Sequence, residues 1–268
     1  MGLDNVVIVL VQPQHPGNVG AAARAMRNMG LSQLVLVDPP AWDPERARWM
    51  APGCDELLAN ARVVGTLADG LAGCQRAIAS TARHRKGTQA VLDASAAATS
   101  ILDAPDGVRT AILFGREDNG LDAASVDACH AVLRIATPEH ASLNLGQAVL
   151  LVAHALFTEA RQRGLQPSGR YLGGRGEPKP TSAVHRGGGR GPADWVAMEP
   201  AVEDLVGLLE RVGYTRSATP EKVGQTARTA LQRANLSFKD VQALRGMVRR
   251  IDWALDHPEL DPRTTSSG

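Results

Sequence analysis

The first 164 residues alternate between short apolar runs and longer segments with helical periodicity. Five runs rich in aliphatic residues predict strands, at residues 6–11, 34–38, 76–81, 109–115 and 131–136. The segments between them predict helices, at residues 19–29, 54–61, 67–74, 94–102, 122–129 and 143–163. Strands that alternate with helices are typical of a parallel sheet covered on both faces. The pattern therefore predicts an α/β domain over residues 1–164.

Apolar periodicity disappears after residue 164. Residues 166–195 contain eight Gly and four Pro, a composition that does not pack into a core. We therefore expect a flexible linker over residues 165–195. Five of its side chains are cationic and two are acidic. Two interpretations stay open: a solvated tether, or a segment that contacts RNA transiently.

Helical signals return in the last third of the chain. Thr219 and Pro220 resemble an N-cap followed by proline in the first turn, and Ser237 with Asp240 resembles an imperfect capping box. The predicted helices cover residues 202–212, residues 219–235 and a segment from residue 237 onward. We expect a small all-α extension over residues 196–258 and a disordered tail over residues 259–268.

The part of the helical extension from Arg211 to Arg250 is basic, although the whole chain is not. Between Arg211 and Arg250 there are nine Lys or Arg residues and two Asp or Glu residues. This imbalance favours contact with nucleic acid over a merely solvated surface. The last helix also carries one apolar stripe at helical spacing, formed by Val241, Leu244, Val248, Ile251 and Leu255.

Composition narrows the class of protein without indicating a partner. The chain has 268 residues, a formal net charge of +1 and 44% hydrophobic residues, so it can bury a sizeable core. Its three cysteines, Cys54, Cys74 and Cys129, have no CxxC spacing, which disfavours a disulfide framework or a zinc site and favours a cytoplasmic location. No signal-peptide pattern opens the sequence. The longest apolar run, residues 148–157, is too short to span a membrane.

Three loops combine glycine with amide, hydroxyl or charged side chains. They are HPGNVG with Arg24 after the first predicted strand, FGREDNGLD after the fourth and IATPEHASLNLGQA after the fifth. Open α/β sheets bind ligands at the carboxyl ends of their strands, and glycine lets a backbone approach a ligand closely. The loops therefore predict a site for a polar ligand at that edge of the sheet.

Each loop also has a purely structural interpretation. Asn18 and Ser142 are suited to cap helices, Arg24 to face solvent and Glu117 to occupy a turn. The occurrence of all three loops together favours a site over these separate explanations. Other catalytic classes are excluded, because the chain has no GxSxG elbow, no P-loop lysine and no histidines at metal-binding spacing.

Together the three loops resemble the three motifs of the SPOUT class of RNA methyltransferases, in its TrmH/SpoU branch. NVGAAARAMRNMG looks like the first motif, ILFGREDNGL the second and IATPEHASLNLGQA the third, in the same order. Within the branch, the chain looks most like enzymes that methylate the ribose 2′-hydroxyl of cytidine or uridine at position 32 of tRNA. Those enzymes carry a similar basic helical extension with a segment like LRGMVRRI. Two alternatives stay open: an enzyme acting on ribosomal RNA, and a non-catalytic paralogue that binds RNA or cofactor.

The resemblance implies a parallel α/β sheet whose C-terminal part threads a trefoil knot, an exception to the usual absence of knots. It implies S-adenosylmethionine as the methyl donor, and it implies no metal and no membrane. It also implies a homodimer in which Arg24 of one subunit reaches the cofactor site of the other. The donor pocket would be lined by Ser80, Thr81, Ala82, Gly115, Ile135, Ala141, Ser142 and Leu143.

The same resemblance assigns roles to the remaining polar residues. Arginine is a poor base because its pKa lies above about 12, so we expect Arg24 to bind phosphate or to stabilise a developing alkoxide. The catalytic group would comprise Arg24, Asn18, Glu117, Ser142 and Asn144. Contacts with tRNA would come from Arg83, Arg85, Arg245 and Arg249.

Overall fold

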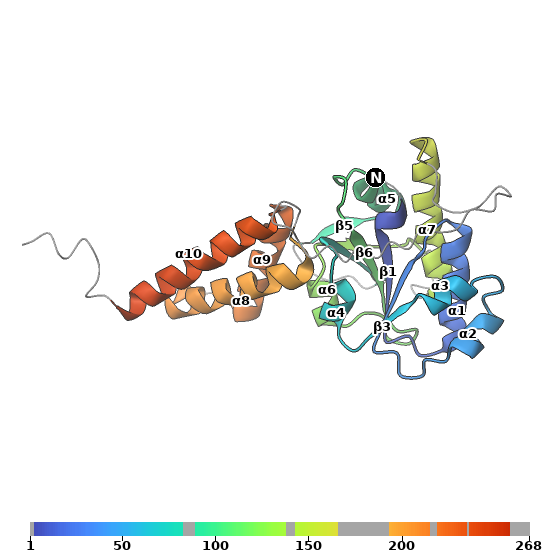
Figure 1. The fold of residues 1–268 in the computed structure, drawn as a ribbon, viewed down its shortest axis with the longest axis horizontal. Helices are drawn as coiled ribbons and strands as arrows, with labels where there is room; N and C mark the ends of the chain where they lie inside the picture. Colours follow the sequence, from blue (N-terminus) through green and yellow to red (C-terminus); the bar gives the residue numbers. More distant parts are fainter. Residues whose placement is uncertain are drawn as a thin grey trace, which may run out of the picture. The chain divides into compact units, whose positions relative to one another are not determined.

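The structure is a computed structural model that describes residues 3–82, 89–137, 143–165, 193–214, 219–234 and 236–257. The chain forms two compact units, Met1–Val184 and His185–Gly268, whose elements are labelled in Figure 1. Most of the predicted linker and all of the predicted tail lie outside the described residues. Within the described ranges, no helix has the length and hydropathy needed to cross a membrane.

A parallel sheet forms the centre of the first unit (Figure 1). Among the described residues it has seven strands, in the spatial order β3-β2-β1-β6-β4-β7-β5, and every pair is parallel. The parallel α/β fold predicted from the sequence is therefore confirmed. The strands are β1 (Val6–Val11), β2 (Gln33–Val37), β3 (Arg62–Val64), β4 (Arg76–Ser80), β5 (Ala90–Leu92), β6 (Thr110–Phe114) and β7 (Ala131–Leu133).

Two of these strands, β3 and β5, were not predicted, and they form the two edges of the sheet. Each has three residues, two of them exposed. An exposed strand of this length has no apolar pattern that distinguishes it from a loop. Short edge strands also limit the row of unpaired backbone groups that an edge presents to other chains.

Helices cover both faces of the sheet (Figure 1). On one face α1 (Pro16–Asn28) packs against α7 (Leu145–Gln162), and α7 packs against α5 (Ala94–Leu102). The short helices α2 (Pro44–Trp49) and α3 (Asp55–Ala59) contact α1, and a 3-10 turn, Leu3–Asn5, precedes β1. The other face carries α4 (Leu67–Leu71) and α6 (Ala123–Asp127).

The boundaries of α1 follow from its proline and its glycine. The helix begins three residues before the predicted start at Val19, because Pro16 occupies its first turn, where the missing N–H has no intrahelical partner to lose. The chain leaves the helix at Gly30, whose φ of 75° is left-handed and typical of a residue just after a helix. The predicted C-terminal signal at Gly30 is thus confirmed.

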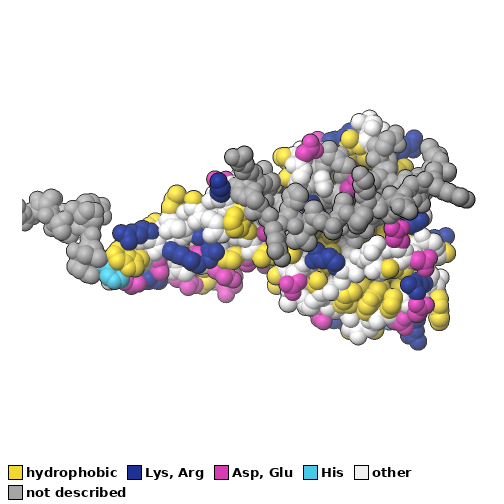
Figure 2. All heavy atoms as spheres, viewed as in Figure 1, with side chains coloured by type: hydrophobic (Ala, Val, Ile, Leu, Met, Phe, Trp, Pro, Cys, Tyr) yellow, Lys and Arg dark blue, Asp and Glu magenta, His cyan; other side chains and the backbone are white. Residues whose placement is uncertain are grey.

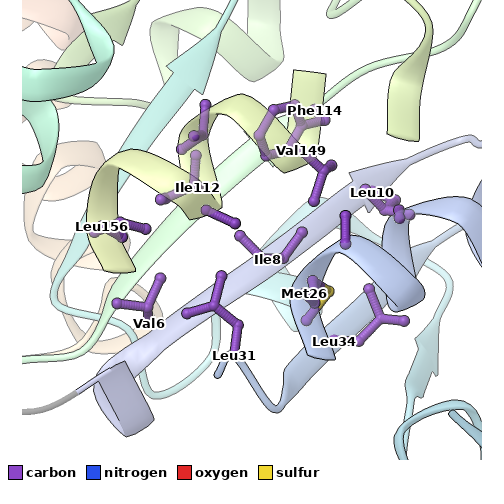
Figure 3. Close-up of a cluster of buried hydrophobic side chains, with 14 of the residues drawn as sticks. Val6, Ile8, Leu10, Met26, Leu31, Leu34, Ile112, Phe114, Val149 and Leu156 are labelled. Atoms are coloured by element: carbon purple, nitrogen blue, oxygen red, sulfur yellow. The ribbon is translucent and has the colours of Figure 1, made fainter. Parts of the chain in front are cut away.

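The main core lies between the sheet and the layer of α1, α5 and α7 (Figure 3). Alternate residues of β1, Val6, Ile8 and Leu10, are fully buried on this side, as the period of two along a strand requires. They face Met26 of α1 and Leu156 of α7. The first helix is therefore held to the sheet by apolar packing along its whole inner face.

Glycines let α1 approach its neighbours at backbone distance. A Cβ added to Gly20 would lie 2.1 Å from the carbonyl oxygen of Ala47 in α2, and one added to Gly146 of α7 would lie 2.7 Å from Cβ of Ala21. No ordinary side chain fits at either contact. These two glycines therefore set the spacing of α1 from α2 and from α7.

The second unit is all helical, with α8 (Trp195–Arg211), α9 (Pro220–Arg233) and α10 (Phe238–Asp256). α8 begins seven residues before the predicted start, because Asp194 caps it by accepting a 2.9 Å hydrogen bond from the N–H of Ala197, and the helix continues through Pro200. The capping box at Ser237 is complete: the Ser237 side chain accepts a hydrogen bond from the N–H of Asp240, and the Asp240 carboxylate accepts one from the N–H of Ser237.

The apolar stripe predicted for α10 is buried only over its first half. Val241 and Val248 are buried, whereas Ile251 and Leu255 are about half exposed, at 51% and 46%. Charge joins the helices as well: Asp204 of α8 accepts hydrogen bonds from Arg245 at 2.8 Å and from Arg249 at 3.2 Å. The unit is therefore held together by a small apolar core and by ion pairs.

Replacing Gly20 by alanine tests the contact between α1 and α2. The added methyl group would overlap the Ala47 carbonyl, so we expect Gly20→Ala to cost about 1–3 kcal/mol of folding free energy. Thermal unfolding followed by circular dichroism measures this cost. The matched control is Gly65→Ala, whose Cβ would meet nothing within 4 Å. Equal melting temperatures for the two variants would contradict the assigned contact.

Candidate active site

The spatial order of the strands brings together loops that are far apart in the sequence. From β1 the chain passes through α1 to β2 on one side, whereas from β6 it passes through α6 to β7 on the other side. The boundary between β1 and β6 is therefore a topological switch point, where open parallel sheets bind ligands beyond the strand ends. The HPGNVG loop follows β1 and the FGREDNGLD loop follows β6, so both lie at this point.

The carboxylate of Glu117 joins these two loops. Its Oε2 accepts a hydrogen bond from the N–H of Gln14 at 2.9 Å, and its Oε1 accepts from Asn18 Nδ2 at 2.8 Å and from the N–H of His15 at 3.4 Å. His15 is the N-cap of α1 and makes no capping bond with its own side chain. Glu117 thus places an acceptor and a negative charge at a helix N-terminus, where both are favourable.

Asn144 connects the third loop to the same cluster. Its Nδ2 donates a 3.1 Å hydrogen bond to Oδ1 of Asn18, and its Oδ1 accepts a 2.9 Å bond from the N–H of Gly146 at the start of α7. Asn144 therefore caps α7, whereas Asn18, for which a capping role was considered from the sequence, lies inside α1 and does not cap it. Through Glu117, Asn18 and Asn144 the three loops form one hydrogen-bonded unit.

Hydrogen bonds keep the Glu117 carboxyl ionised. Burial raises its pKa, but the bonds from Gln14, Asn18 and His15 lower it by more, and the net pKa lies below the usual glutamate value. A carboxylate that accepts several N–H bonds is stabilised in its charged form. At neutral pH Glu117 therefore acts as a charged acceptor and does not donate a proton.

Residues predicted to bind the methyl donor lie at the ends of three adjacent strands. Ser80 ends β4, Gly115 follows β6 and Ile135 lies just beyond β7, and β6, β4 and β7 are neighbours in the sheet. Their carboxyl ends point the same way because the strands are parallel. The N–H of Thr81 also bonds to the carbonyl of Leu133 at 3.1 Å, which holds the β4 and β7 ends together.

Gly115 is required by its own loop. A Cβ there would lie 2.1 Å from the backbone of Gly120, because the loop folds back into a bridge between Arg116 and Gly120. The close approach that glycine permits is therefore between two parts of the FGREDNGLD loop. The prediction that Gly115 also contacts the donor stays a prediction.

Part of the predicted site lies outside the described residues. Ala141 and Ser142 of the third loop, and the predicted RNA contacts Arg83 and Arg85, belong to the ranges 138–142 and 83–88 that the structure does not describe. Of the remaining donor-site residues, Leu143 is half-buried and Ala82 is exposed. The trefoil knot implied by the resemblance stays a prediction as well.

Arg24 lies apart from the cluster in its own chain. It is six residues beyond Asn18 on α1, which places it about 9 Å further along the axis and about 120° around it. Its side chain is exposed. With Arg27 it lies on the side of α1 near the buried thiol of Cys54: burial raises the pKa of that thiol, and the charges of Arg27 and Arg24 oppose the rise. Within one chain, then, Asn18 and Arg24 serve different surfaces.

The sequence did not reveal a second series of hydrogen-bonded polar residues at the same edge of the sheet. Gln12 and Asp38 follow β1 and β2, both with left-handed φ angles of 49° and 45°, and Gln12 Nε2 donates to Asp38 Oδ2 at 2.8 Å. Gln14 Nε2 in turn donates to the carbonyl of Gln12 at 2.6 Å. Non-glycine residues with positive φ are strained and concentrate at functional sites. Positive φ leaves no pattern in the sequence at Gln or Asp, so no signal was available.

The three polar loops are hydrogen-bonded together at the topological switch point of a parallel sheet. This arrangement fits an enzyme that binds a small ligand, and comparison with known proteins identifies the class of enzyme. The model of the SpoU rRNA Methylase family matches residues 5–154, more than half of the chain. The chain belongs to the SpoU methylase family and is a methyltransferase.

Relatives within the family are similar to this protein in sequence and in structure over nearly the whole chain. A tRNA (cytidine/uridine-2′-O-)-methyltransferase TrmJ from Cronobacter sakazakii is 33% identical over 258 residues, which cover 93% of this chain and 97% of that relative. The crystal structure of TrmJ from Z. mobilis ZM4 superposes with a TM-score of 0.71 at 31% identity, covering 92% of this chain and 98% of that one. A methylase family protein from Haemophilus influenzae Rd KW20 gives a TM-score of 0.58 at 27% identity, covering 96% and 99%.

Replacing Glu117 by glutamine tests whether its charge joins the loops. The native carboxylate has a lowered pKa, so it stabilises the fold above the unfolded-state value near 4.5, and this contribution is lost as the pH falls through the folded-state pKa. We expect Glu117→Gln to lower stability at pH 7 by about 1–2 kcal/mol, since the group is only half-buried. Melting temperatures measured from pH 7 to pH 3 should show the gap to the native protein closing in acid.

The matched control is Asp118→Asn in the same loop. Asp118 pairs with Arg116 at 2.7 Å on an exposed surface, where solvent screens such pairs and they contribute little to stability. A pH-independent gap for Glu117→Gln, or an equal effect of both substitutions, would show that the loops are not joined by the Glu117 charge.

Proposed function

We propose that this protein transfers a methyl group from S-adenosylmethionine to the ribose 2′-hydroxyl of cytidine or uridine at position 32, in the anticodon loop of tRNA. The observation that carries the proposal is the hydrogen-bonded unit of Glu117, Asn18 and Asn144 at the switch point, in a chain of the SpoU methylase family. The relatives that match nearly the full chain bear the name tRNA (cytidine/uridine-2′-O-)-methyltransferase. Such a substrate implies a cytoplasmic location.

The chemistry of the strand ends suits the proposed donor. S-adenosylmethionine combines a flat apolar base, ribose hydroxyls and a charged amino-acid end. Ile135 and Leu143 offer half-buried apolar surface, and Ser80 and Thr81 offer half-buried hydroxyls on the adjacent strand end. Adenine binding needs apolar walls with polar groups at the rim, and these residue types fit. We assign the donor to this edge and the acceptor nucleotide to the β1 side.

The bound donor supplies an electrophilic methyl group with a neutral thioether as leaving group. During transfer the carbon–sulfur bond would break, the carbon–oxygen bond would form and the proton of the 2′-hydroxyl would pass to solvent water, so negative charge would develop on the acceptor oxygen. In this proposal Glu117, Asn18 and Asn144 hold the loops in place, and the guanidinium of Arg24 stabilises the oxygen or an adjacent phosphate.

Because Arg24 lies away from the cluster of its own chain, we propose that it acts in the site of a second copy. Large apolar side chains are exposed on the elements that flank α1: Trp49 and Met50 at the end of α2 are 79% and 53% exposed, and Leu150 and Leu151 of α7 are 39% and 45% exposed. Met50 lies 3.5 Å from the Cβ position of Gly17 in α1. Exposed apolar surface of this kind is typical of subunit interfaces.

Mapping of ribose methylation tests the function directly. Nucleotide-resolution mapping of 2′-O-methylation in total RNA, from cells with and without the protein, should show loss at tRNA position 32 and restoration by the re-expressed gene. Loss confined to ribosomal RNA would instead establish the alternative that the family description suggests. Donor binding without transfer to any RNA would indicate a non-catalytic paralogue.

Replacing Arg24 by alanine separates charge stabilisation from donor binding. We expect transfer to fall by about 10²–10³-fold, the usual effect of removing a group that stabilises developing charge, while donor affinity stays nearly unchanged. Single-turnover transfer of labelled methyl groups measures the first quantity, and isothermal titration measures the second. The control is Arg27→Ala, another exposed arginine one turn further along α1. Lost donor binding by Arg24→Ala would refute the role assigned to it.

Mixing two inactive variants tests whether Arg24 acts across a dimer. Arg24→Ala keeps the donor site, and Ile135→Glu blocks it while keeping Arg24. Random pairing makes half of the dimers mixed, each with one complete site, so the mixture should recover about a quarter of native activity. If Arg24 acts within its own chain, every mixed dimer is inactive and no activity returns.

A further inference from the structure

One face of the last helix, α10, carries three exposed cations and the Trp253 ring, and the ring of the C-cap residue His257 lies on the same side. At about 100° per residue, five side chains fall within an arc of about 100°: Lys239, Arg249, Arg250, Trp253 and His257. Lys239, Arg249 and Arg250 are exposed, as is Trp253 at 37%. We refer to this set as the basic–aromatic face. Figure 2 shows several dark-blue Lys and Arg side chains on the second unit.

Three other arginines of the unit, Arg211, Arg228 and Arg245, are engaged in joining its helices. Arg211 of α8 pairs with Asp252 and Asp256 of α10, and Arg228 of α9 pairs with Glu199 of α8. Arg245, one of the predicted RNA contacts, is held by Asp204 and is only 20% exposed. These ion pairs use the acidic side chains that would otherwise oppose an anionic ligand. Over residues 196–258 the nine Lys or Arg residues are nearly matched by eight Asp or Glu residues, so positive charge is exposed only where the fold leaves cations away from these acids.

The acids of α10 leave the basic–aromatic face unopposed. Asp252 and Asp256 bind Arg211, and Asp240 is held in the capping box with Ser237. Among the described residues, none of the ion pairs involves Lys239 or Arg250, and Arg249 remains 63% exposed although its Nε reaches Asp204. An exposed strip of cations whose neighbouring acid, Asp204, is shared with Arg245 complements a phosphate backbone.

The far end of the face is an ordered stack. The guanidinium of Arg250 lies 4.2 Å from the centroid of the Trp253 ring, and the His257 ring lies parallel to the indole at 4.3 Å between centroids and 16° between planes. His257 Nδ1 is 2.9 Å from the carbonyl oxygen of Trp253, which fixes the ring. The Trp253 indole thus has the Arg250 guanidinium over its ring and the His257 imidazole stacked parallel to it.

Gly246 leaves room in the middle of the face. A Cβ at this position would meet nothing within 4 Å, so the backbone of α10 is open to a ligand there. Lys239 lies about two turns before this gap and the stack about two turns after it, a separation of about 20 Å along the axis. That length suits several nucleotides of extended single-stranded RNA.

We propose that the basic–aromatic face of α10 binds an unpaired stretch of the RNA substrate, with one base extending the Arg250–Trp253–His257 stack and the flanking phosphates held by Lys239 and Arg249. Bases stack on aromatic rings and on guanidinium planes, and such contacts serve single strands because a duplex already has its bases stacked internally. This inference rests on the proposed function for the identity of the RNA. It moves the principal contact from Arg245 to the far end of α10.

Binding of native protein and Trp253→Ala to a tRNA transcript and to a perfectly paired RNA duplex of equal length tests the stack. Loss of one stacked base weakens binding by about 5–100-fold, so we expect that effect with tRNA and none with the duplex. The matched control is Ile251→Ala, a 51% exposed position on another flank of α10, which should bind both RNAs like native protein. Equal affinity of Trp253→Ala and native protein for tRNA, or equal weakening with both RNAs, would overturn the stack.

The phosphate contacts can be tested separately through the salt dependence of RNA binding. For Lys239→Ala combined with Arg249→Ala, the slope of log Kd against log salt concentration should fall by about 0.7–0.9 for each phosphate that is no longer neutralised, and an unchanged slope would overturn this part. Thermal unfolding and donor titration of each variant show that the fold and the donor site are intact. Native protein that binds tRNA through this face yet methylates no tRNA would refute the proposed function and leave the RNA-binding face standing.

Discussion

One carboxylate holds the candidate site together. Glu117 reaches from the loop after β6 to the backbone and side chains at the start of α1, and Asn18 passes the connection on to Asn144 at the start of α7. The amino ends of two helices and the carboxyl ends of two strands meet in this cluster. Its donors find their acceptors in distant parts of the chain, so no single loop takes up its conformation alone. The same hydrogen bonds that join the loops to Glu117 stabilise its charged form and lower its pKa.

Prediction from sequence succeeded where the apolar pattern was long and failed where structure depended on partners distant in the chain. β1 and α5 have the predicted bounds, because continuous burial or a clear cap marks them. β3 and β5 were missed because three half-exposed residues carry no period. In the site, residue types and family resemblance pointed to Asn18, Glu117 and Asn144. The left-handed backbone of Gln12 and Asp38 was beyond reach, since it is imposed by packing around the strand ends.

The ion pairs of the helical unit are a second feature that could not be predicted from the sequence. The excess of Lys and Arg between Arg211 and Arg250 is evident in the sequence, but the sequence does not say which of these cations are neutralised by acids on other helices. Arg245 and Arg211 meet their partners only after α8 and α10 have packed. What remains exposed is a subset selected by the fold, and its pattern differs from that of the basic residues along the chain. An estimate of nucleic-acid binding from net charge alone overstates the available surface and misplaces it.

Gly20 lets α1 approach the backbone of α2, and Gly146 lets α7 approach Ala21 of α1. A helix clamped at backbone distance on both sides has little freedom to rotate or slide. The backbone that carries Arg24 is therefore held in place on both sides, and the side chain of Arg24 is exposed. The entropic cost of ordering this long side chain is then confined to its own torsions.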